Sequence, residues 1–217
     1  FRGPVIAKLW PGLQRVASDY RNEVEFHFRG IDPGDFPAMK CDVHFKPFTH
    51  SYDSYLAELS STYFDLSLTP LEGETRAERS KSPIKLLESV AAGAISVMSD
   101  VAPYSHLPDE VCVKVRNRPE DWADAIERLL KLKAEQRDEI LERARAYVES
   151  YYTTEIQYYD FYGALAATEL HARLKDKAIL YAFHEAALGG ATLHLLRHAG
   201  LVSSFGCQVR AGDMVRR

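Results

Sequence analysis

One short segment carries the most recognisable chemistry of the chain, with Lys81, Ser82, Lys85 and Glu88 close together. A helix is predicted over residues 82–92, so the two lysines and the serine lie near its amino end, and the glutamate lies one to two turns further in. Free backbone N–H groups and the helix dipole favour an anion at that end. A carboxylate on the same helix can accept hydrogen bonds from a ribose diol. These residue types therefore predict a site for pyrophosphate and ribose, the handle of a nucleotide sugar.

The elements around this segment alternate between strands and helices. Strands are predicted at 24–28, 43–45, 64–69, 94–98, 111–115 and 178–183, and helices at 5–20, 52–63, 82–92, 119–130, 134–151, 154–174 and 191–199. This alternation predicts an α/β fold, a doubly wound parallel sheet with flanking helices. Ligands of such sheets bind beyond the carboxyl ends of the strands. The loop over residues 69–81 leaves a strand at that edge, so the segment lies where a site is expected.

The overall composition is that of an ordinary globular protein. The 217 residues are 46% hydrophobic and 27% charged, enough to bury a core. The net charge of −4 gives no electrostatic case for a nucleic-acid partner. Three scattered cysteines indicate free thiols in a reducing compartment. No apolar run approaches the roughly 20 residues of a membrane span. We therefore predict a cytoplasmic protein, and attachment to the inner membrane surface stays open.

Several segments recur in the order and spacing of a known enzyme family: Phe64–Leu71, Lys81–Glu88, Ala92-Gly93, Ser99–Tyr104 and the helix containing Trp122. On these segments, residues 24–165 resemble the C-terminal, donor-binding half of a GT-B glycosyltransferase, of the family 4 or glycosyl transferases group 1 type. The resemblance implies a Rossmann-like domain that binds a nucleotide-diphosphate sugar. It also implies transfer of the sugar to a sugar, lipid or glycan acceptor hydroxyl, with retention of configuration, in polysaccharide or glycan biosynthesis.

The resemblance also implies roles for individual residues. Glu88 would hold the nucleotide ribose, and Lys81, followed by Lys85, would neutralise the diphosphate leaving group beside Ser82. No metal or other cofactor is expected, because lysine and the helix N-terminus supply the positive field. The donor phosphate would itself help to deprotonate the acceptor, so no protein general base is named. Arg76 and Arg79, in the loop before the motif, could touch phosphate or be solvated.

One departure from the family pattern concerns the transferred sugar. The family usually has a second glutamate eight positions before Glu88, and this chain has Ser80 there. Glu74 and Glu78 are nearby but out of register. This difference favours an alternative reading, a non-catalytic α/β module with a degenerate donor site. An epimerase on a similar fold is a further alternative, but no acid/base pair is found near the motif.

The domain organisation is the other departure. We predict a nucleotide-sugar-binding domain over 1–176 whose first strand is absent, and a strand–helix extension over 177–217. The chain would then be a fragment whose partner, an N-terminal acceptor domain, is missing. Basic residues near the first helix could match family donor ligands: Arg2, Lys8 and Arg15.

The extension either opens a second glycosyltransferase unit or packs on the first domain. Two pairs within it have the residue types of metal ligands, His184 with Glu185 and His194 with His198. No third ligand is evident beside either pair, which favours an ordinary helix face.

Overall fold

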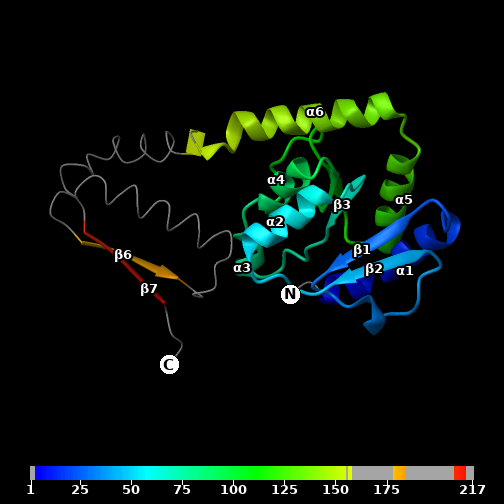
Figure 1. The fold of residues 1–217 in the computed structure, drawn as a ribbon, viewed down its shortest axis with the longest axis horizontal. Helices are drawn as coiled ribbons and strands as arrows, with labels where there is room; N and C mark the ends of the chain where they lie inside the picture. The colour runs from blue at the N-terminus through cyan, green and yellow to red at the C-terminus, as the bar shows by residue number, and fades with distance from the viewer. Residues whose placement is uncertain (1–2, 155, 158–177, 184–207, 214–217) are drawn as a thin grey trace. The chain divides into compact units, whose positions relative to one another are not determined.

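The computed structural model describes residues 3–154, 156–157, 178–183 and 208–213 (Figure 1). The chain divides into two units, one of Phe1–Thr49 with Leu56–Glu149 and one of His50–Tyr55 with Ser150–Arg217. Every element near the predicted site belongs to the first unit. None of the helices in the described part of the chain is long and apolar enough to cross a membrane.

The helices and strands follow the predicted alternation. The helices are α1 Gly3–Asp19, α2 Tyr52–Ser61, α3 Arg76–Arg79, α4 Ile84–Ala91, α5 Pro119–Leu130 and α6 Ala134–Tyr151, with a 3₁₀ turn at Pro33–Asp35. The strands are β1 Glu25–Arg29, β2 Asp42–Lys46, β3 Leu66–Thr69, β4 Ile95–Ser99, β5 Val113–Val115, β6 Ala178–Phe183 and β7 Gln208–Asp213. The helices predicted over 154–174 and 191–199 lie almost wholly outside the described residues. The boundary predicted between residues 176 and 177 stays a prediction.

All pairings between the described strands are parallel, so the predicted α/β class is confirmed. In the first unit, β1 pairs with β2, and β4 lies between β3 and β5 in a second sheet. In the second unit, β6 pairs with β7 along six residues. The described strands therefore form small separate sheets, because no backbone ladder joins β1 to β3.

Helix α1 connects the two sheets of the first unit through its side chains. Trp10 stacks on Phe36 and contacts Phe28 of β1, with ring centroids 5.5 Å apart in the latter pair. The hydrophobic cluster around Trp10 also takes in Leu66 and Leu68 of β3. In Figure 1, α1 lies behind β1 and β2. Side-chain burial therefore holds together two sheets that share no hydrogen-bond ladder.

The packing of α1 against α5 depends on one glycine. A Cβ atom at Gly12 would lie 2.0 Å from the carbonyl oxygen of Pro119, the first residue of α5. Only a residue without a side chain permits this approach. Beside it, Arg15 forms ion pairs with Asp124 and Glu127 of α5. These carboxylates raise the pKa of the Arg15 guanidinium, so Arg15 fastens α1 to α5.

Candidate functional site

Helix α4 runs from the carboxyl end of β3 back to the amino end of β4, so its first turn lies at the sheet edge where a ligand is expected. The helix begins at Ile84, two residues later than predicted, and its N-cap residue Pro83 makes no side-chain capping hydrogen bond. Lys81 and Ser82 precede the helix and are exposed. A helix start without a side-chain cap has N–H groups available to an anion.

The glutamate of the motif is nearly buried. Its side chain is 7% exposed, and Lys85 Nζ forms an ion pair with Glu88 Oε2 from one turn earlier on the helix. The Lys85 side chain is 33% exposed, so its ammonium group lies at the boundary between the helix and solvent. The structure thus brings Lys85 and Glu88 together on one side of α4.

A closed ring of hydrogen bonds joins the carboxyl ends of β3, β4 and β5. The Leu71 N–H donates to Ser99 Oγ over 2.8 Å, and the Ser99 hydroxyl donates to Asn117 Oδ1 over 2.6 Å. Asn117 Nδ2 in turn donates to the Leu71 carbonyl oxygen over 2.8 Å. The ring fixes where the chain leaves β3. Local sequence patterns do not reveal this ring, because its members are 18 to 46 residues apart.

The next residues of this loop are held by a tight contact. Gly73 has φ +73°, and a Cβ atom there would lie 2.7 Å from Val101 Cβ. Glu72 lies beside it, and its carboxylate is 3.7 Å from Lys8 Nζ of α1. The carboxylate of Glu72, with a side chain 24% exposed, is therefore held at the carboxyl end of β3. Glu72 is not among the site residues predicted from the sequence.

The segment between this loop and α4 contains an unpredicted helix. In α3, the Thr75 hydroxyl accepts from the Glu78 N–H, and the Glu78 carboxylate accepts from the Thr75 N–H, which is a capping box. The Thr75 N–H and the Thr75 hydroxyl both donate to the Glu78 carboxylate, and these two hydrogen bonds lower the pKa of Glu78. Ser80 ends the helix, and its hydroxyl donates to the Arg76 carbonyl oxygen. Glu78 therefore caps the start of α3, and Ser80 caps its end.

A protein-family model described as glycosyl transferase-like matches residues 12–160. The chain belongs to this family. The match extends from the middle of α1 beyond the end of α6, and it includes the whole of the motif and the ring of hydrogen bonds. No curated protein matches the chain. Membership confirms the resemblance and the Rossmann-like fold, and it supports a role in glycosyl transfer.

The other basic residues that were predicted as possible donor ligands lie in different surroundings in this glycosyl transferase-like domain. Arg15 is ion-paired with Glu127 of α5, and Lys8 is ion-paired with Glu72. Arg76 and Arg79 are exposed on α3. Arg2 and the histidine pairs of the C-terminal segment lie outside the described residues.

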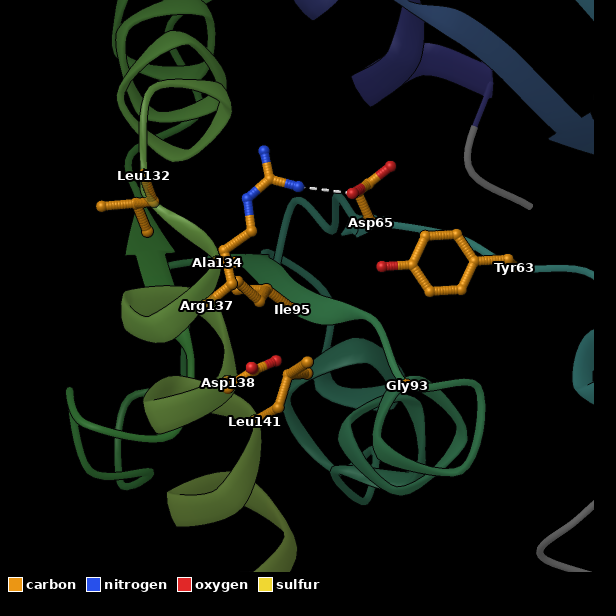
Figure 2. A pocket seen from close by; sticks show the side chains of 9 residues that line it. All are labelled: Tyr63, Asp65, Gly93, Ile95, Leu132, Ala134, Arg137, Asp138 and Leu141. Carbon is orange, nitrogen blue, oxygen red and sulfur yellow. Dashed lines mark hydrogen bonds and ion pairs between the residues drawn. The ribbon is translucent and has the colours of Figure 1, made fainter.

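A hollow of about 220 Å³ lies at the other end of the sheet formed by β3, β4 and β5, away from the start of α4 (Figure 2). Its lining includes Asp65, just before β3, and Gly93, just before β4. Figure 2 shows Arg137 of α6 directed at Asp65, with which it forms an ion pair. Because this hollow borders the amino ends of the strands, it is separate from the start of α4. The predicted roles of Lys81, Ser82, Lys85 and Glu88 stay predictions.

Proposed function

We propose that this glycosyl transferase-like domain binds a nucleotide-diphosphate sugar at the carboxyl ends of β3 and β4, against the start of α4. The observation that carries the proposal is the pairing of a helix start without a side-chain cap and a nearly buried carboxylate on the same helix. The first favours the diphosphate, and the second can accept hydrogen bonds from a ribose. Family membership supplies the reaction class.

The diphosphate would lie against Lys81, Ser82 and the first N–H groups of α4. Lys81 is exposed and precedes the helix by three residues, so its flexible side chain can follow an anion at that end. Cleavage of the sugar–phosphate bond builds negative charge on the departing diphosphate. The N–H groups at the start of α4 are already in place and stabilise this charge without reorganisation, and the Lys81 ammonium group adds positive charge.

The ribose would lie further along α4, at Glu88. A carboxylate this poorly exposed is costly in free energy unless it is paired, and Lys85 provides the pair. An ionised carboxylate has about four lone-pair positions, so it can accept from the ribose hydroxyls while it keeps Lys85. In this arrangement Lys85 stabilises Glu88 and also adds positive charge near the diphosphate.

Transfer would proceed to a sugar, lipid or glycan acceptor hydroxyl, with retention of configuration, in polysaccharide or glycan biosynthesis. The donor phosphate would assist removal of the acceptor proton, and an acceptor domain would close over the donor and exclude water. No metal or other cofactor takes part in this proposal. We assign contact with the transferred sugar to Glu72, because Ser80 is bonded within α3 and Glu72 is held at the strand end.

The experiment is calorimetric titration of the chain with UDP, GDP and ADP, alongside Lys81→Ala and Glu88→Gln. We expect one nucleotide to bind, and each variant to weaken it about tenfold or more, since one lost charged hydrogen bond is worth about 1.5–3 kcal/mol. Lys131→Ala is the matched control, because Lys131 is exposed at the end of α5. Equal affinity in the control and the Lys81→Ala variant would contradict the placement.

A second candidate function is a non-catalytic α/β module with a degenerate donor site. The observation that favours it is Ser80, which stands where the family usually has a glutamate and whose hydroxyl is bonded to Arg76. The same titration separates the two functions. A folded chain that binds none of the three nucleotides would favour the module.

A further inference from the structure

A cluster of two imidazoles and one carboxylate lies on the sheet formed by β1 and β2, and the proposed function does not use it. His27 of β1 and His44 of β2 are opposite each other in the parallel register, and Glu25 lies two residues before His27. Side chains alternate between the two faces of a strand. Phe26 and Phe28 pack into the cluster around α1, so the two histidines and Glu25 lie on the other face.

The ligand atoms of these side chains converge. Glu25 Oε1 is 2.8 Å from His27 Nε2, and Glu25 Oε2 is 3.2 Å from His44 Nε2. The two imidazole rings stack with their centroids 4.5 Å apart. An edge contact between His27 and Phe64, with centroids 5.1 Å apart, helps to orient the first ring. The Glu25 carboxylate thus lies beside the Nε2 atom of each ring.

We propose that Glu25, His27 and His44 bind a divalent transition-metal ion of the zinc type. Zinc in proteins is bound by imidazole nitrogen and carboxylate oxygen, and a His₂Glu set with one open position is a known arrangement. Imidazole ligands favour zinc and its neighbours in the series, and oxygen-rich sites favour magnesium. An ion bound by these atoms takes the place of the hydrogen bonds between the carboxylate and the two rings.

The three side chains need to move only a little to coordinate an ion. Their ligand atoms all lie within 4.8 Å of one another. Tetrahedral coordination with metal–nitrogen bonds of about 2.0–2.1 Å needs nitrogens about 3.3 Å apart. The side chains of Glu25 and His44 are 58% and 52% exposed, so both can turn without disturbing the core. Their exposure also leaves the fourth position of the ion open to water.

The position of the cluster separates it from the donor site. It includes the first and third residues of β1, whereas the proposed donor site lies beyond the carboxyl ends of β3 and β4. An ion here would join two strands through their side chains. The two-stranded sheet would gain a cross-link, and nucleotide binding would not need the ion.

The experiment is calorimetric titration of the full chain with Zn²⁺, alongside His27→Gln, His44→Gln and Glu25→Gln. We expect one zinc ion per chain to be lost from the stoichiometry, or its affinity to fall at least tenfold, in each histidine variant. Glu25→Gln should weaken binding by a smaller factor. His106→Gln is the matched control, because His106 is exposed outside the cluster. Nitrogen-15 NMR of the imidazoles should show the Nε2 signals of His27 and His44 shifting together.

Two results of the zinc titration would overturn the inference. One is a folded wild-type chain that binds no zinc. The other is zinc binding that persists unchanged in a His27→Gln/His44→Gln double variant, which would assign the ion to other histidines or to cysteines. Circular dichroism of each variant checks that the exposed substitutions leave the fold intact. A titration with Mg²⁺ should show no binding at this cluster, and magnesium binding lost in Glu25→Gln would contradict the zinc assignment.

Discussion

Replacement of Asn117 by alanine should destabilise the first unit far more than its half-exposed position suggests. The amide accepts from the Ser99 hydroxyl and donates to the Leu71 carbonyl oxygen, at 2.6 and 2.8 Å. Ser99 is fully buried, so its hydroxyl would lose an acceptor without gaining water. With about 1 kcal/mol for each of the two lost hydrogen bonds and about 1–2 kcal/mol for the stranded hydroxyl, the free energy of unfolding should fall by about 3–4 kcal/mol.

The assay is urea unfolding followed by tryptophan fluorescence. The two tryptophans, Trp10 and Trp122, both lie in the first unit, so the signal reports on this unit. Asn22→Ala is the matched control, because Asn22 is exposed and should change the free energy by less than about 0.5 kcal/mol.

A double-mutant cycle tests whether the ring acts as one unit. Ser99→Ala alone removes the acceptor of the Leu71 N–H and should cost about 2–3 kcal/mol. The Ser99→Ala/Asn117→Ala pair should cost less than the sum, with an interaction of about 1 kcal/mol or more. The reasoning would be refuted if the two single effects on the free energy of unfolding added up to the double effect within about 0.5 kcal/mol. It would also be refuted if either single substitution lowered the free energy of unfolding by less than about 0.5 kcal/mol.

Two further predictions concern a loop and a thiol. Gly73→Ala should lower the free energy of unfolding by about 2–4 kcal/mol in the same assay, because alanine is strained at φ +73° and its Cβ would collide with Val101; an unchanged midpoint would contradict this. Burial raises the pKa of Cys112 to about 11 from 9.0, so the folded state keeps the thiol neutral where the unfolded state ionises. The stabilisation is complete below about pH 9 and should be lost, by about 2–3 kcal/mol, as the pH rises to 11. Cys112→Ala should remove this alkaline loss, which unfolding curves at pH 8 and 10.5 would show.

The sequence predicted the elements of the site better than the contacts within it. Strand and helix periodicity located β3, α4 and β4, since each has a continuous local pattern. It did not reveal α3, a helix of four residues that depends on the reciprocal hydrogen bonds of Thr75 and Glu78. It also placed the start of α4 two residues early, because Ser82 before Pro83 has the composition of a helix start and the structure begins the helix at Ile84.

Contacts between distant residues were not predictable from local patterns. Asn117 and Leu71 are 46 residues apart, and only the order of the strands brings them together. His27 and His44 likewise meet because β1 and β2 pair in one particular register. A one-residue slip in that register would move one imidazole to the opposite face. Local periodicity contains no information on register between strands far apart in sequence.

The division of the first unit into two sheets has a mechanical consequence. A hydrogen-bond ladder fixes the register of two strands residue by residue. Side-chain packing is non-directional, so it fixes the relative position of two sheets much less specifically. With no ladder between β1 and β3, side-chain packing around α1 sets the position of one sheet against the other. Lys8 connects α1 to Glu72 at the edge where we place the donor. A ligand that displaced this contact would remove one restraint on α1. Because α1 packs on both sheets, the position of one sheet relative to the other would then change.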